Sequence, residues 1–429
     1  MRGYQSKGLA VFTLLTLAGC GSAGNDTTPS GAGGADSVGG AAGSISAAGG
    51  TSGAAGGAAG HAATDAGAPG TGGSPGIGGA SGTGGQAGAR GTGGSAGSTG
   101  GATGTGGTGG TSGAVPLDPT LLSLCTGTNP IRCTIPVAAN GDYTVTVELG
   151  DPAAASSSRV QAELLRVVIP TTALAAGQLS QQTFSVNVRA EVHDGYSAPG
   201  MILDLLIDGT APRLHGLGVA ARPNLPTIFL AGDSTVCDWD PAATNILSPI
   251  QRGWGQEFSQ YFGPGIAVAD YADSGETAGS FYSKFFPAER TAMRAGDYLF
   301  IQFGHNDQKA QADIDAYQAN LMKYISDARA RNVTPVLFTP VARRTATAAN
   351  PGFAGLDQQA RALAAAQNVA LVDLTSLAIA YYPTVPDLSL FFATPTEGTH
   401  FSESGATQIA NLVAQALKTS TLPLKTYER

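Results

Sequence analysis

The sequence predicts an α/β fold with a mainly parallel sheet over residues 224–429, preceded by a small β-sandwich (jelly-roll-like) module over residues 116–223. Three observations lead to this prediction. Continuous apolar runs bounded by Pro and Gly recur in the C-terminal part, amphipathic helical patterns lie between them, and strand patterns without helices fill the preceding part. We call the first region the α/β domain and the second the β-module.

Four apolar runs in the α/β domain are typical of buried parallel strands. They cover residues 227–231, 297–303, 333–338 and 369–372. The clearest helix is predicted for residues 313–331, because apolar residues recur there at intervals of three or four. Its apolar face consists of Ile314, Tyr317, Leu321, Ile325 and Ala328. In such folds, functional residues gather at the carboxyl ends of the strands.

The β-module shows period-two patterns instead. Residues 142–149 alternate between polar and apolar side chains after the turn signal Asn140-Gly141. Further strands are predicted for residues 159–169, 183–189 and 201–207. Two roles suit a module of this kind equally well, sugar binding and structural packing.

The N-terminus predicts export. Arg2 and Lys7 precede a short apolar run, residues 9–17, which is typical of a signal peptide and too short to span a membrane. The run ends in Leu17-Ala18-Gly19-Cys20, which resembles a bacterial lipobox. We therefore expect a lipoprotein signal peptide over residues 1–20 with Cys20 acylated; the alternative is an ordinary signal peptide with a chance Cys. Either prediction implies the cell envelope, with a lipid anchor in the outer membrane or at the cell surface, or the extracellular space.

Residues 21–115 form a Gly/Ala/Ser/Thr-rich tract that contains almost no charge and cannot bury a core. We expect a disordered tether whose root-mean-square reach is roughly 50–60 Å. After residue 20, no apolar run reaches the length of a transmembrane helix. The net charge of −8 without a Lys/Arg block argues against nucleic-acid binding.

Four cysteines occur in the chain. Cys125 and Cys133 are close enough in sequence to form a disulfide in an oxidising compartment. Cys237 then remains, and we expect a packed thiol rather than a nucleophile. The histidines show no zinc-site spacing, so neither a metal nor a cofactor is expected.

Chemistry-bearing residues follow the predicted strands. Ser234 stands directly after the first apolar run, where its backbone N–H can face a developing oxyanion. Near the C-terminus, Glu397 precedes His400 by three residues, ahead of an amphipathic helix over residues 405–417. This pattern predicts that the imidazole deprotonates Ser234 and that the carboxylate orients the imidazole. No Gly-x-Ser-x-Gly elbow surrounds Ser234, which excludes the usual α/β-hydrolase arrangement.

At this point the sequence resembles a known family. Four blocks match the SGNH (GDSL) hydrolases in order, and the match covers about residues 225–417. The blocks are Gly232-Asp233-Ser234, Gly275 within residues 273–277, Gly304-x-Asn306-Asp307 and the terminal x-x-His400. Finer similarity to the rhamnogalacturonan acetylesterase branch of carbohydrate esterases lies in residues 228–235, 253–255, 296–308 and 339–344. The resemblance implies a three-layer α/β/α sandwich.

The resemblance also implies roles. Ser234 would be the nucleophile and His400 the general base, and the N–H groups of Ser234 and Gly275 with the Asn306 side chain would form the oxyanion hole. The family usually has Asp three residues before the His, where this chain has Glu397, so Asp387 is a possible substitute. The family commonly carries Arg after the Gly275 block, where this chain has residues 276–280 without Arg.

Candidate substrate contacts are Trp254, Arg343 and Arg344; the two arginines suit a uronate carboxylate, with a solvated surface pair as the alternative. His305 is expected to be structural. The function implied is removal of acetyl groups from a plant cell-wall polysaccharide, most simply rhamnogalacturonan, by a serine esterase. The alternatives are an acetylxylan, small-ester or lipid esterase of the same fold, and a non-catalytic glycan-binding surface lipoprotein.

Overall fold

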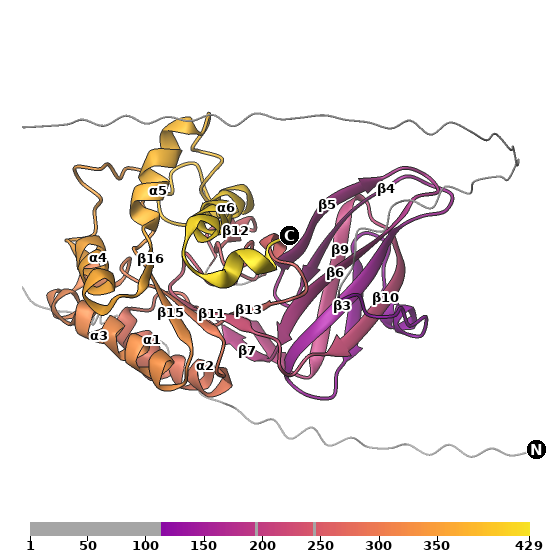
Figure 1. The fold of residues 1–429 in the computed structure, drawn as a ribbon. Helices are drawn as coiled ribbons and strands as arrows, with labels where there is room; N and C mark the ends of the chain where they lie inside the picture. Colours follow the sequence, from indigo (N-terminus) through magenta and orange to yellow (C-terminus); the bar gives the residue numbers. More distant parts are fainter. Residues whose placement is uncertain (1–112, 194–195, 243–245) are drawn as a thin grey trace, which may run out of the picture. The chain divides into compact units, whose positions relative to one another are not determined.

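The computed structural model describes residues 113–193, 196–242 and 246–429 (Figure 1). The described residues belong to one compact unit. The predicted signal peptide with Cys20 lies outside the described residues, as does the predicted tether up to residue 112.

The β-module consists of strands and one short 3-10 helix, η1 (Leu121–Leu124). Its larger sheet has the strand order β1-β2-β9-β4-β5, and a second sheet has the order β10-β3-β6. All pairs in both sheets are antiparallel, and side chains of both sheets share one hydrophobic cluster. The strands are β1 (Cys125–Thr126), β2 (Ile131–Pro136), β3 (Gly141–Gly150), β4 (Ser156–Ala162), β5 (Arg166–Leu174), β6 (Leu179–Val188), β9 (Ile202–Ala211) and β10 (Leu214–Ala221), with β7 (Ala190–His193) and β8 (Tyr196–Pro199) forming a separate pair.

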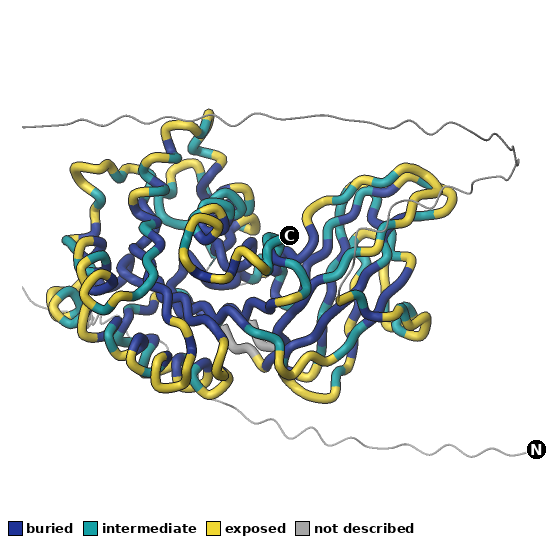
Figure 2. Tube along the Cα trace, in the orientation of Figure 1, coloured by how far each residue is buried: buried dark blue, intermediate teal, exposed yellow. Residues whose placement is uncertain are grey.

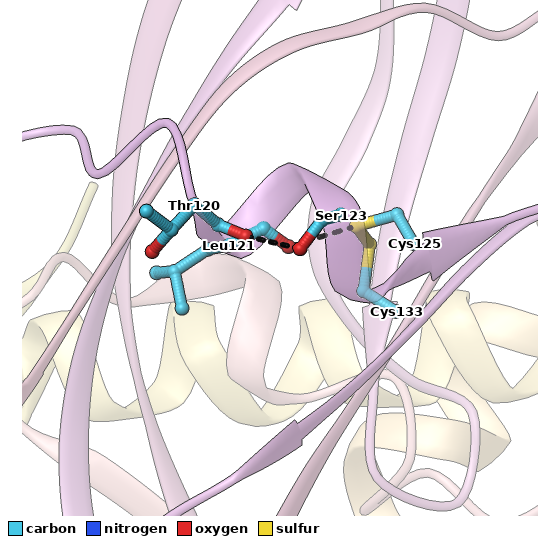
Figure 3. Close-up of a disulfide and its surroundings, with 5 residues drawn as sticks. All are labelled: Thr120, Leu121, Ser123, Cys125 and Cys133. Atoms are coloured by element: carbon cyan, nitrogen blue, oxygen red, sulfur yellow. Dashed lines mark hydrogen bonds between the residues drawn. A yellow bond between two sulfur atoms is a disulfide. The ribbon is translucent and has the colours of Figure 1, made fainter.

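One disulfide lies at the start of the β-module. Cys125 of β1 and Cys133 of β2 are register partners and are bonded to each other. Figure 3 shows the bond beside η1, where the Cys125 sulfur also lies 3.8 Å from the Leu121 carbonyl oxygen. The link therefore joins the η1 turn to the edge of the larger sheet.

The continuous strand predicted for residues 159–169 is wrong. The chain reverses at residues 163–165, between β4 and β5, and both Glu163 and Leu165 have positive φ. The apolar pattern hides this reversal because Leu164, at the tip of the turn, is itself buried. Its burial comes from packing against another part of the chain, which a local pattern does not express.

The α/β domain contains the predicted parallel sheet. Its strand order is β13-β11-β14-β15-β16, and every neighbouring pair is parallel. The strands are β11 (Thr227–Gly232), β13 (Ala267–Asp270), β14 (Tyr298–Gln302), β15 (Thr334–Phe338) and β16 (Ala370–Val372). Sequence analysis missed β13, a four-residue edge strand that is too short to give a pattern of its own.

Helices cover both faces of this sheet (Figure 1). On one face, alternate strand residues such as Phe229 and Leu299 share a hydrophobic cluster with α1 to α4. On the other face, residues such as Ile228 and Phe300 share a second cluster with α5 and α6. Strands β11, β13 and β14 are buried throughout, β15 and β16 are more exposed in part, and the outward faces of the helices are exposed (Figure 2). The helices are α1 (Ala278–Lys284), α2 (Phe286–Ala292), α3 (Gln311–Ala330), α4 (Leu356–Gln367), α5 (Leu374–Tyr381) and α6 (Glu403–Thr419).

Short elements complete the domain: β12 (Gln251–Arg252) pairs with β17 (Phe401–Ser402), and the 3-10 helices are η2 (Ser259–Tyr261), η3 (Asp307–Lys309), η4 (Tyr382–Thr384) and η5 (Pro423–Tyr427). Within the described part of the chain, no helix is both long and apolar enough to cross a membrane.

The strand order reverses between β11 and β14, because the chain adds β13 on one side of β11 and the later strands on the other. At such a switch point the loops after the two strands diverge and leave room for a ligand at the carboxyl ends. Ser234 follows β11 and Asn306 follows β14. The topology therefore brings two of the predicted site residues to the same edge of the sheet.

Candidate active site

Ser234 lies in a tight turn directly after β11. The Asp233 carboxylate fixes this turn, since its Oδ1 atom accepts hydrogen bonds from the backbone N–H of Thr235 at 3.0 Å and from the Thr235 hydroxyl at 2.7 Å. Asp233 is fully buried, and burial raises the pKa of its carboxyl group. The turn is thus held from inside the protein, with Ser234 at its apex.

A chain of buried side chains supports the turn from behind. Gln302, the last residue of β14, donates from Nε2 to the Thr235 hydroxyl at 2.7 Å. The Trp254 indole donates to Gln302 Oε1 at 3.0 Å, and the Trp254 backbone N–H donates to the Thr235 carbonyl, also at 3.0 Å.

The prediction that Trp254 contacts substrate is therefore wrong. Only 1% of its surface is exposed, and its ring stacks on Phe338 in the core at a centroid distance of 5.6 Å. The conformation of Gly253-Trp254-Gly255 requires its glycines. A Cβ at Gly253 would lie 2.2 Å from the Cys237 carbonyl oxygen. The segment packs its backbone against the turn that carries Ser234.

His400 faces Ser234 from the loop before β17. Its Nε2 atom lies 3.0 Å from the Ser234 hydroxyl oxygen. Burial lowers the pKa of His400 below the usual histidine value of 6.5, and the negative charge of Glu397 opposes this shift only in part. The imidazole is therefore neutral near pH 7 and able to accept the serine proton.

Glu397 lies on the other side of the His400 ring. Its Oε1 atom is 3.3 Å from His400 Nδ1, an ion-pair distance, and it also accepts hydrogen bonds from the backbone N–H groups of Thr399 at 2.8 Å and His400 at 3.2 Å. Partial burial acts to raise the pKa of Glu397, but these N–H groups and the charge of His400 outweigh it and lower the pKa. The carboxylate is thus ionised and oriented by the same short turn that carries His400.

Asp387 takes no part in this arrangement. Its Oδ1 atom accepts hydrogen bonds from the backbone N–H of Ser389 at 2.8 Å and from the Ser389 hydroxyl at 2.6 Å, in an exposed turn. Within the described residues, no contact joins it to His400. Of the two candidate acids, the structure places Glu397 at the imidazole.

Three predicted donors follow the carboxyl ends of neighbouring strands: Ser234 follows β11, Gly275 follows β13 and Asn306 follows β14. Gly275 has a φ of +80°, a conformation that Gly adopts without strain. Within the described residues, neither its backbone N–H nor that of Ser234 donates to a protein acceptor. The Asn306 amide donates through one Nδ2 hydrogen to the Glu276 carbonyl at 2.9 Å, and its Oδ1 accepts a hydrogen bond from Lys309 at 2.7 Å. These two contacts fix the amide and leave its second Nδ2 hydrogen without an acceptor among the described residues.

The segment over residues 276–280 forms the start of a helix rather than a substrate contact. The Glu276 carboxylate is buried and pairs with Lys284 at 2.8 Å. Thr277 and Ser280 form a reciprocal capping box that begins α1. The Arg that the family pattern places here has no counterpart in this segment.

His305 and Cys237 are packed residues. His305 is fully buried with Nε2 2.9 Å from the Val341 carbonyl oxygen, and burial holds its pKa well below 6.5. Burial, together with nearby carboxylates such as Asp273, raises the pKa of the Cys237 thiol well above 9.0, so the thiol is protonated and unreactive.

Two cationic side chains flank the catalytic histidine candidate. Arg343 is partly buried, donates from Nε to the Thr399 hydroxyl at 3.2 Å, and has no carboxylate within ion-pair distance among the described residues. Lys309 is exposed, and its positive charge contributes to the lowered pKa of His400. Arg344 lies on the same loop as Arg343 but donates to the Pro395 carbonyl. Among the described residues, no group of three or more His, Cys, Asp or Glu side chains is arranged to hold a metal ion.

Sequence analysis did not identify two residues that contact the site, Trp239 and Lys309. Trp239 donates from its indole N–H to the Ser234 carbonyl at 3.0 Å, and its ring meets the His400 ring edge-on at a centroid distance of 6.0 Å. Lys309 follows Asn306 by three residues in η3, a spacing that puts the two side chains side by side. That spacing was a usable signal for Lys309, whereas nothing local marks Trp239.

Comparison with known proteins agrees with this geometry. Residues 230–408 match the model of the GDSL-like lipase/acylhydrolase family. Rhamnogalacturonan acetylesterase RhgT of Bacillus subtilis is 34% identical over 218 residues, which is 46% of this chain and 92% of that protein. The uncharacterized esterase YxiM of the same organism is 29% identical over 299 residues, 65% of this chain and 72% of that protein. The crystal structure of protein YxiM covers 68% of this chain and 80% of its own, with 26% identity and a TM-score of 0.41.

The order of the four blocks, the serine–histidine contact at the end of β11 and these similarities lead to one assignment. The chain belongs to the GDSL (SGNH) hydrolase family, in its rhamnogalacturonan acetylesterase-like group, and is a carboxylic ester hydrolase.

Proposed function

We propose that this protein removes acetyl groups from a plant cell-wall polysaccharide, specifically acetylated rhamnogalacturonan, through an acyl-enzyme on Ser234. The observation that carries the proposal is the 3.0 Å contact between the Ser234 hydroxyl and His400 Nε2, with unpaired donors beside it. The relative named rhamnogalacturonan acetylesterase, 34% identical over 92% of its length, supports the substrate class.

In the first half of the reaction, His400 Nε2 accepts the Ser234 proton as Oγ attacks the acetyl carbonyl carbon. The carbonyl oxygen becomes an oxyanion, which the N–H groups of Ser234 and Gly275 and the Asn306 amide stabilise. The imidazolium then protonates the departing sugar oxygen, and the acetyl group remains on Ser234. In the second half, His400 takes a proton from water as the water oxygen attacks the acetyl-serine carbonyl carbon. The bond from that carbon to Ser234 Oγ then breaks, the imidazolium returns its proton to Oγ, and acetate leaves.

Glu397 acts through His400. Its carboxylate faces Nδ1, so it favours the tautomer with the proton on Nδ1 and stabilises the imidazolium once it forms. The backbone N–H groups that hold Oε1 keep the carboxylate in place although Glu is one methylene longer than the Asp usual in the family.

The charges around the site support an acidic polysaccharide. The chain carries a net charge of −8, yet Lys309 and Arg343 flank His400, and Arg343 has no carboxylate partner among the described residues. A guanidinium without a carboxylate partner suits a uronate carboxylate of an acidic polysaccharide. The intact set of nucleophile, base and donors argues against a purely glycan-binding protein.

We further propose that the enzyme is a bacterial envelope lipoprotein or is exported. The apolar run over residues 9–17, followed by Cys20, supports an acylated N-terminus. Residues 21–115 would then act as a tether, the β-module over residues 116–223 as a β-sandwich, and residues 224–429 as the catalytic domain at the end of the tether.

The central prediction concerns Ser234. Ser234→Ala removes the nucleophile and should lower kcat for acetate release by about a thousandfold or more, because the acyl-enzyme is not formed. The measurement is acetate release from acetylated rhamnogalacturonan, acetylated xylan and 4-nitrophenyl acetate, with circular dichroism to verify folding. Full activity of the alanine variant would refute the mechanism, and release from xylan alone would refute the substrate.

A second prediction separates the two candidate acids. Glu397→Gln should lower kcat about 100-fold or more with little change in KM, because the imidazolium loses its partner only in the transition state. Asp387→Asn is the matched control, since its carboxylate serves only the Ser389 turn, and it should stay within about twofold of the wild type. The reverse pattern would make Asp387 the orienting acid.

The third prediction concerns pH. The base must be neutral, so kcat/KM falls as pH drops through the pKa of His400, and the midpoint should lie below 6.5. Glu397→Gln should move the midpoint to lower pH, because it removes the negative charge that favours the imidazolium. Lys309→Met should move it to higher pH, because it removes a positive charge that disfavours the imidazolium. Stopped assays between pH 4 and 8 give these midpoints, and shifts of the opposite sign would contradict the assignment of the base.

The fourth prediction tests the substrate charge. Arg343→Gln should raise KM for acetylated rhamnogalacturonan by about tenfold and leave kcat/KM for neutral 4-nitrophenyl acetate nearly unchanged. Arg344→Gln is the control on the same loop, because its guanidinium is held by the Pro395 carbonyl. Equal losses on both substrates would show that Arg343 only supports the fold of the loop.

A further inference from the structure

The β-module reaches the loop of the nucleophile through one buried ion pair. Arg166, the first residue of β5, donates from Nε to Asp238 Oδ2 at 2.7 Å, and its Nη2 lies 2.5 Å from the same oxygen. The two side chains are 1% and 0% exposed. Asp238 stands four residues after Ser234, so a residue of the β-module holds the loop that follows the nucleophile.

A second arginine of the β-module lies beside this contact. Arg189 donates to the backbone carbonyl of Asp270, at the end of β13. The Asp270 side chain is fully buried, and burial raises its pKa well above the usual value; the charge of Asp238 raises it further, and the charges of Arg166 and Arg189 lower it. Both Arg166 and Arg189 thus reach from the β-module to residues of the α/β domain near the Ser234 loop.

Gln256 adds a neutral link at the same place. Its Nε2 atom donates to the Leu164 carbonyl of the β4–β5 turn at 2.8 Å and to the Trp239 carbonyl at 3.1 Å. The Gln256 backbone carbonyl accepts a hydrogen bond from the Val167 backbone N–H at 2.8 Å. Gln256 therefore links the turn at residues 163–165 to Trp239, directly beside the pair of Arg166 and Asp238.

Trp239 connects this contact region to the reacting groups. Its indole N–H donates to the Ser234 carbonyl at 3.0 Å, and its ring packs edge-on against the imidazole of His400. A displacement of Asp238 and Trp239 would move the turn that carries Ser234. It would also move the aromatic ring that packs against His400. A displacement of a reacting group by about 1 Å is enough to lower the rate of the chemical step about 100-fold.

We propose that Arg166 is a positioning residue for the esterase reaction, which acts through Asp238 and Trp239 on Ser234 and His400. The β-module is in this sense part of the active site. A buried ion pair adds little stability compared with an apolar pair of similar volume, so its effect lies in orientation. Two nitrogens of the Arg166 guanidinium, Nε and Nη2, contact the same Asp238 oxygen, and this shared contact restricts the direction from which Asp238 can lie against Arg166. This inference rests on the serine mechanism proposed above.

The test uses the full chain with 4-nitrophenyl acetate, a substrate too small to need glycan contacts. Arg166→Met should lower kcat about 10- to 100-fold with KM changed by less than about threefold. Arg166→Lys keeps the charge but not the two-nitrogen contact and should recover part of kcat. All rates are measured well below the unfolding midpoint of each variant, which thermal unfolding provides.

Arg429→Met is the matched control. Arg429 also joins the two regions, donating to the carbonyls of Val168 at 2.7 Å and Thr183 at 2.9 Å, but it does not touch the nucleophile loop. Its variant should keep kcat within about twofold. Equal kcat in the Arg166→Met and Arg429→Met variants would overturn the proposal, because the ion pair would then only join the two regions.

If the Arg166→Met variant does not fold, the Trp239→Phe variant tests the proposal instead. This variant leaves the ion pair in place, removes the indole donor to Ser234 and makes the ring that meets His400 smaller. It should show the same loss of kcat, and unchanged kcat would overturn the proposal. Failure of the serine mechanism is recognised separately, since Ser234→Ala would then remain active. An active wild type with an inactive Ser234→Ala and unaffected Arg166→Met and Trp239→Phe variants would refute only the positioning role.

Discussion

The buried Asp233 carboxylate, which accepts both hydrogen bonds from Thr235, is the interaction on which the site depends. It closes the turn after β11, and Gln302 and Trp254 hold Thr235 from two other parts of the chain. Hydrogen bonds in a dry interior are strong and costly to leave unmade, so this network has one low-energy arrangement. That arrangement aims Ser234 away from the core and leaves its backbone N–H free for an oxyanion.

Charge placement around the turn sets the state of the base. Burial raises the pKa of Asp307 to about 7, with the charge of Asp233 adding to the effect, and burial of His400 lowers its pKa. Glu397 provides the one carboxylate at ion-pair distance from the imidazole among the described residues. The histidine is therefore neutral before the reaction and has a partner for its positive charge during it, which is the electrostatic requirement of a serine esterase.

The contacts of the β-module favour the packing role over an independent sugar-binding role. Arg166 and Leu164 contact the loop after the nucleophile, and Arg429 at the chain end binds back to β5 and β6. A module that was only tethered would expose these polar groups to water. Here Arg166 and Leu164 are buried, and all three residues are hydrogen-bonded across the boundary, so the two regions fold as one compact unit.

The sequence by itself determined four of the five parallel strands, the turn with Ser234, and the order of Asn306 and His400, because apolar runs and short motifs express these features locally. Tertiary structure alone decided the rest. It buried Trp254, chose Glu397 over Asp387, reversed the chain at Leu164, and set Arg166 against Asp238. The physical reason is separation along the chain: Arg166 and Asp238 lie 72 residues apart, and no local pattern records which distant side chains will share one dry interior.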